Sequence, residues 1–153
     1  MTTPGLRWLA PLGAHPTVGA ARSALADRGR VDLSGLTGPA RALAPLLVAE
    51  PPLLVVVPRE RDVDETAEDL RTLAAEAAHE GAVTAFPAPG PPPFRGLPRH
   101  MDASSRRAAA LLAAGEGALH ALVASPAGLL RPSLAPTLLD TRVVHLEAGE
   151  EMT

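Results

Sequence analysis

The chain of 153 residues contains no cysteine, no lysine and no tyrosine. Without cysteine it can form no disulfide, no thiolate metal site and no cysteine nucleophile. All 14 basic residues are therefore arginines, and 17 acidic residues bring the formal net charge to −3. A negative net charge argues against a broad nucleic-acid-binding surface, although it leaves room for a local one.

Long apolar runs are also missing. The run Leu53–Val57 has the length of a strand, and no apolar run approaches the ~20 residues that cross a bilayer. Residues 1–7 lack the apolar core and the cleavage site of a signal peptide. The five histidines are scattered, and no pair has the spacing of a zinc site, so we expect no metal. These absences predict a cytoplasmic protein with one globular domain.

Helix and strand patterns alternate along the chain. The β-rich run Leu53–Val57 is typical of a strand buried on both faces of a parallel sheet. Asp62–His79 is the clearest predicted helix, because acidic residues occupy its first turn and apolar residues line one face. The other predicted helices are 17–28, 40–49, 103–113 and 126–130. The other predicted strands are Val31–Ser34, Val83–Phe86, Leu119–Ala124 and Arg142–Leu146.

The alternation implies right-handed crossovers and an α/β fold, a three-layer domain with a parallel sheet of four or five strands. Residues 1–16 read as an irregular lead-in, and residues 87–98, with six prolines, as a stiff surface loop. Thr17 and Asp102 are predicted N-caps, and Gly29 is predicted to end the first helix. In such sheets the functional segments lie at the C-terminal ends of the strands.

Residues 35–42 have the outline of a phosphate-binding loop without its chemistry. A working loop follows G-x-x-x-x-G-K-[ST], in which backbone N–H groups and the lysine hold phosphate and the hydroxyl holds Mg²⁺. Gly35 fits the first glycine, but the three later motif positions are occupied by Ala40, Arg41 and Ala42. Pro39 also removes one backbone donor. We therefore expect no cofactor here. Two alternatives stay open: the segment is a plain turn that caps a helix, or Arg41 and the Gly35–Gly38 amides still bind a phosphate group.

Three polar clusters bear on chemistry. The residue types of a nucleophilic triad occur together in His100, Asp102, Ser104 and Ser105. Because triad members normally come from separate elements, this grouping favours a helix start beside a loop histidine. The carboxylates of residues 62–69 have a spacing that fans them around a solvated helix face, so no catalytic residue is predicted. The third cluster is basic and consists of Arg95, Arg99, His100, Arg106 and Arg107. We expect it to contact either nucleic-acid phosphates or acidic groups of its own or a neighbouring domain.

The order of short motifs after residue 86 resembles a known family. Pro93-Phe94 is followed by His100-Met101-Asp102 and Ser104-Ser105-Arg106, and then by residues 119–132, which read LHALVASPAGLLRP. This order is similar to the N-terminal UvrB-like module of the bacterial transcription-repair coupling factors (Mfd). There a P-Y-D turn leads to S-P-H-x-D, an S-x-R helix start and an apolar strand running into P-V-x-x-L-L-x-x-x-P. The resemblance spans residues 20–150 and departs from the pattern at Phe94, Arg95 and Arg99.

The resemblance implies a RecA-like, P-loop-like domain with a degenerate nucleotide loop over residues 17–146, and the start of a following subdomain at 147–153. Proteins of this family are ATP-dependent DNA translocases that displace stalled RNA polymerase and recruit UvrA. The present segment would be a non-catalytic scaffold that packs on other domains of its parent chain, with ATP and Mg²⁺ confined to the parent's motor. Two alternatives stay open: a stand-alone nucleotide- or phosphate-binding α/β protein, and an interaction protein that mimics the UvrB-like surface.

Overall fold

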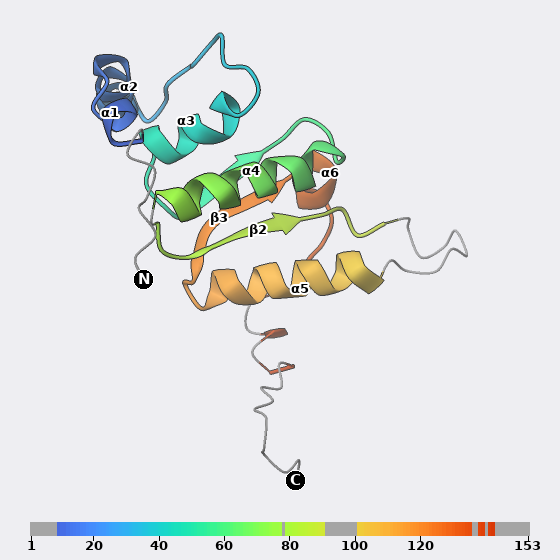
Figure 1. The fold of residues 1–153 in the computed structure, drawn as a ribbon. Helices are drawn as coiled ribbons and strands as arrows, with labels where there is room; N and C mark the ends of the chain where they lie inside the picture. Colours follow the sequence, from blue (N-terminus) through green and yellow to red (C-terminus); the bar gives the residue numbers. More distant parts are fainter. Residues whose placement is uncertain (1–8, 78, 91–100, 136–137, 140, 143–153) are drawn as a thin grey trace.

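The sheet is small, open and parallel (Figure 1). A computed structural model describes residues 9–77, 79–90, 101–135, 138–139 and 141–142. Within them the strands are β1 (Leu53–Val56), β2 (Ala82–Phe86) and β3 (Leu119–Ala124). The central strand β3 pairs with both others, in the order β1-β3-β2. The predicted α/β class is confirmed, with three strands in the described part instead of the expected four or five.

The strand register brings all three strand ends to one edge. Val56 of β1 and Phe86 of β2 both lie opposite Ala124 of β3. The segments that follow the strands therefore lie close together, as the sequence predicted for a parallel sheet.

Helices cover both faces of the sheet. Their bounds are α1 Leu9–Gly13, α2 Pro16–Arg28, α3 Ala40–Val48, α4 Asp62–Glu76, α5 Met101–Gly115 and α6 Pro126–Leu129. Helix α4 packs on β2 and β3 from one side, and α5 packs on the same two strands from the other. Helix α3 packs on α4, and α2 packs on α3, so the N-terminal helices extend the layer above the sheet (Figure 1).

The main core lies between α4 and the sheet. Its helical side is the predicted apolar face of α4, with Val63, Ala67, Leu70 and Ala74 all buried. Val123 of β3 and Ala42 of α3 close the same cluster. A smaller cluster around Phe86 and Ala110 joins α5 to the opposite face. Burial of each large apolar side chain contributes about 1.5–3 kcal/mol, which is the main force that holds α4 on the sheet.

Strand β1 differs from the prediction. It was expected to be buried on both faces, yet Leu54 is 57% exposed and Val56 51% exposed. Their neighbours Leu53 and Val55 pack against the main core. The reason is tertiary: within the described part of the chain, α5 packs on β2 and β3, which leaves this side of β1 exposed.

The structure also differs from the prediction in two N-terminal segments, one predicted as a strand and one as irregular. Residues 31–34 do not form a strand, and Leu33 is 43% exposed, because no described strand offers this segment a hydrogen-bonding ladder. Residues 9–13, expected to be irregular, form α1, in which Pro11 sits in the first turn where proline is tolerated.

Two predicted helix caps are wrong. Helix α2 begins at Pro16, and the His15 Nδ1 atom accepts the Thr17 N–H (3.3 Å), so His15 is the N-cap in place of Thr17. Helix α5 already begins at Met101, which puts Asp102 in its first turn, where a carboxylate suits the helix dipole. Gly29 ends α2 as predicted. The predicted strand Arg142–Leu146 lies outside the described residues except for Arg142, which is in a turn.

Candidate functional site

The degenerate loop forms a glycine turn that leads into α3. Gly35 and Gly38 have φ angles of 77° and 52°, a region that L-residues other than glycine rarely adopt. Helix α3 then starts at Ala40, behind Pro39, which provides no side-chain cap. The geometry of the turn therefore explains both glycines without reference to phosphate.

The first N–H groups of α3 are already used within the chain. Arg41 N–H donates to Gly38 O (3.1 Å), and the N–H of Ala42 donates to Pro39 O (3.1 Å). Ala40 N–H likewise donates to Thr37 O (3.2 Å). A phosphate-binding loop depends on such groups being free to point at the anion. These bonds, together with the missing N–H of Pro39, remove the donors that the start of α3 would offer to a phosphate.

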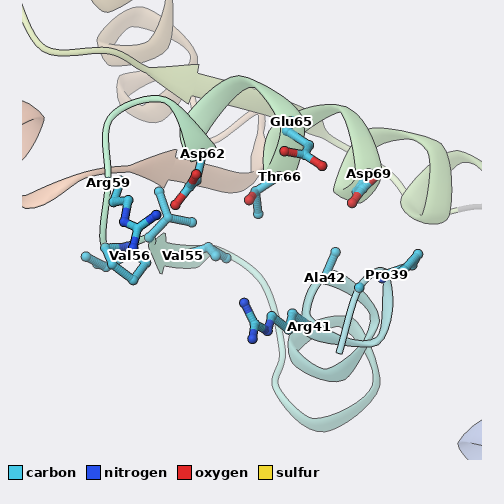
Figure 2. Close-up of a pocket in the computed structure, with 13 residues that line it drawn as sticks. Pro39, Arg41, Ala42, Val55, Val56, Arg59, Asp62, Glu65, Thr66 and Asp69 are labelled. Carbon is cyan, nitrogen blue, oxygen red and sulfur yellow. The ribbon is translucent and has the colours of Figure 1, made fainter. Parts of the chain in front are cut away.

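A cavity of about 690 Å³ opens beside this turn (Figure 2). Its volume is in the range of small-ligand pockets. It is lined by α3 residues and the turn before them, by the end of β1 with the loop after it, and by one face of α4. The lining residues are Gly38, Pro39, Arg41, Ala42, Val55, Val56, Val57, Pro58, Arg59, Asp62, Glu65, Thr66 and Asp69.

Charges of both signs line the cavity. Asp62, Glu65 and Asp69 come from α4 at spacings of three and four residues, which places them on one helix face. Arg41 projects from α3, and Arg59 from the loop after β1 (Figure 2). With three carboxylates and two guanidinium groups, the formal charge of the lining is −1, which is unfavourable for a polyphosphate.

Some of these charges have partners inside the chain. Arg41 Nε donates to Leu36 O (3.1 Å), which turns this arginine back toward its own loop. Asp62 Oδ1 lies 3.5 Å from Arg61 Nε, in a pair that is mostly exposed. Sequence reasoning expected the carboxylates of residues 62–69 to fan around a solvated face. The structure brings three of them to one cavity, for which their i, i+3, i+7 spacing is the signal.

A second polar group ties the strand ends together. Ser125, only 1% exposed, donates its hydroxyl hydrogen to a Glu60 carboxylate oxygen. The other Glu60 oxygen accepts the Ala88 N–H (2.6 Å). Ser125 Oγ also accepts the Gly128 N–H (3.1 Å) and so caps α6. Glu60 thus links the segments that follow all three strands, and both side chains are committed to structure.

Arg107 has an internal role. It is 6% exposed, and Nη1 donates to Pro87 O (2.8 Å) and to Gly128 O (3.0 Å). Nη2 donates to Ser133 Oγ (2.7 Å), and the guanidinium carbon lies 3.9 Å from the centre of the Phe86 ring. Burial lowers the pKa of Arg107, which stays charged at any ordinary pH.

Arg106 faces the other way, toward α4. It pairs with Asp64 in a two-pronged contact and approaches Asp102 Oδ2 at 3.8 Å. The hydrogen bond from Arg106 lowers the pKa of Asp64, and the same bond raises the pKa of Arg106. Of the predicted basic cluster, the structure therefore describes one arginine inside the fold and one in a surface ion pair. Arg95, Arg99 and His100 lie outside the described residues.

Among the described residues of the candidate triad, Asp102, Ser104 and Ser105 all lie on the first turns of one helix, α5. Ser104 and Ser105 are both exposed. Within the described ranges, no three histidine, aspartate or glutamate side chains come together as metal ligands. No helix of the described part is long and apolar enough to cross a membrane.

Comparisons with protein-family models, with curated proteins and with solved structures found no match.

Proposed function

We propose that this chain is a non-catalytic α/β scaffold module that resembles the UvrB-like module of transcription-repair coupling factors. In that role it packs against other domains of a larger DNA-repair translocase. The RecA-like, P-loop-like identity of the fold belongs to the same proposal, as do UvrA, RNA polymerase and double-stranded DNA as partners of the parent protein. Its motif order after Phe86 supports the family, and the parallel sheet agrees with the fold class.

One observation carries the non-catalytic part of the proposal. The position that a phosphate loop would occupy has its helix-starting N–H groups bonded to Thr37, Gly38 and Pro39 carbonyls. The adjoining cavity presents the carboxylates of Asp62, Glu65 and Asp69. Anion binding at a helix start needs free N–H donors on its first turn and positive potential, whereas here the N–H groups of residues 40–42 are bonded and the cavity lining has a formal charge of −1.

Calorimetric titration with ATP and Mg²⁺ tests this part. We expect no saturable binding up to millimolar nucleotide, and a dissociation constant in the micromolar range would contradict the scaffold reading. The matched control is the triple variant Ala40→Gly/Arg41→Lys/Ala42→Ser, which restores the motif residues. Because Pro39 and the α4 carboxylates remain in this variant, we expect it to show no saturable binding either.

The assignment to a repair factor has a separate test. The purified chain is mixed with a transcription-repair coupling translocase expressed without its UvrB-like module, and the mixture is passed over a size-exclusion column. Co-elution is the expected result, with an unrelated α/β domain as the control. Separate elution at high micromolar concentration of both components would remove the support for this partner.

A further inference from the structure

The two outer strands of the sheet, β1 and β2, differ in whether a side chain covers the main-chain groups at their outer edge. Val57 N–H donates to Ala124 O (2.9 Å), which fixes the direction of the main chain of β1. Because N–H and C=O groups alternate in direction along a strand, the groups of Leu54 and Val56 point away from β3. These two residues therefore present donors and acceptors at the outer edge of β1.

The outer edge of β2 is guarded. Ala82 N–H donates to Ala118 O (2.7 Å), so the main-chain groups of Val83 point away from β3. The guanidinium of Arg71 on α4 donates to Val83 O (3.3 Å) and occupies that edge. Helices α4 and α5 also pack on both faces of β2. Capping an open edge with a charged side chain is a usual protection against added strands.

The edge of β1 has no such protection among the described residues. The strand reads Leu-Leu-Val-Val, with no charge, and its register with β3 shows no bulge. Leu54 and Val56 lie opposite Leu122 and Ala124, whose side chains belong to the cluster beneath α5. Their own side chains extend this apolar surface to the edge, where both are more than half exposed. An apolar, unguarded edge strand is a template for strand addition.

Charge at the end of β1 indicates what kind of strand fits. Three consecutive residues, Val55–Val57, line the cavity described above, so the cavity borders the strand end. Its α4 wall carries Asp62, Glu65 and Asp69, of which Glu65 and Asp69 have no ion pair within the described part. Arginine or lysine on an added segment would complement these carboxylates, and an acidic segment would be repelled.

We propose that the outer edge of β1 is the docking site for an extended basic segment of another domain or protein, which adds to the sheet as a fourth strand. Its main chain pairs with Leu54 and Val56, its apolar side chains cover theirs, and a basic side chain reaches the carboxylates of the cavity. This inference rests on the proposed scaffold role and names the surface through which the scaffold is engaged.

Selection from a random dodecapeptide display library on the immobilised chain tests the proposal. Peptides with alternating apolar residues and at least one arginine or lysine are expected to be enriched. The selected peptides are then measured by fluorescence anisotropy against variants. Val56→Pro removes an outward N–H without removing a bond to β3, and proline is tolerated in an edge strand. Val56→Ile keeps both the N–H and the apolar side chain and is the matched control.

We expect Val56→Pro to weaken peptide binding at least tenfold and Val56→Ile to leave it within about twofold. The triple variant Asp62→Asn/Glu65→Gln/Asp69→Asn should weaken binding of basic peptides and abolish its salt dependence. Circular dichroism spectra matching wild type would establish that each variant is folded. The proposal is overturned if no peptide is enriched, or if the enriched peptides bind Val56→Pro unchanged. It is also overturned if light scattering shows a dimer of this chain that Leu54→Lys dissociates, because the edge would then bind a second copy.

Discussion

The neighbouring arginines of α5 provide the strongest test of the structure. Arg107→Ala removes a buried guanidinium that holds the Pro87 and Gly128 carbonyls at 2.8 and 3.0 Å. Each buried carbonyl left without a donor costs about 1–3 kcal/mol, and the lost stacking on Phe86 costs about 0.5–2 kcal/mol. Since the guanidinium itself is costly to bury, we expect a net loss near 3–5 kcal/mol.

Arg106→Ala is the matched control, because it changes the adjacent residue of the same helix. Its side chain is 34% exposed and its partner Asp64 67% exposed, and ion pairs of this kind contribute about 0–1 kcal/mol. Urea unfolding followed by circular dichroism at 222 nm measures both variants against wild type. Small domains have a total stability of about 5–15 kcal/mol, so Arg107→Ala should lose a large part of it.

The reasoning would be refuted if both variants lost the same small amount, below about 1 kcal/mol. Arg107→Lys separates charge from geometry, since an ammonium cannot reproduce the planar fork that reaches Pro87, Gly128 and Ser133. We expect it to recover less than half of the stability lost in Arg107→Ala. Full recovery would mean that charge alone matters at this position.

Two further predictions concern packing and pH. A Cβ atom on Gly128 would lie 2.8 Å from Phe86 O, so Gly128→Ala should cost about 1–3 kcal/mol, whereas Gly19→Ala, on an open stretch of α2, should gain about 0.5–1 kcal/mol. Thermal unfolding curves of both variants check this pair, and a stable Gly128→Ala would contradict the close approach. Burial and the nearby His120, whose ring centre is 4.8 Å away, lower the pKa of His79. The unfolded chain then takes up the proton first, so stability should fall as pH drops below about 6.5, and His79→Gln should reduce this slope. Parallel stability curves for wild type and His79→Gln between about pH 8 and pH 5 would show that His79 does not contribute.

Local signals were sufficient for much of the secondary structure. Leu119–Ala124 is the apolar strand that the sequence predicts, and the apolar stripe of α4 forms the main core. Gly29 ends α2 because the left-handed backbone there is a local property of glycine. Such features depend on residues a few positions apart, which any reading of the sequence contains. The same holds for the phosphate-loop outline, whose missing lysine and hydroxyl are visible in residues 35–42.

Tertiary structure decided the rest. Val31–Ser34 and Leu53–Val56 both have strand-like sequences, but a strand exists only where another strand offers a ladder. Among the residues that the structure describes, only the second segment has such a partner. The exposure of Leu54 and Val56 depends on where α5 lies, which no local pattern encodes. Adjacent positions on a helix point about 100° apart, so Arg106 reaches a surface carboxylate while Arg107 is buried against Phe86. The sequence alone determined which residues were available, and the packing of α4 and α5 on the sheet determined which of them became core, ion pair or open edge.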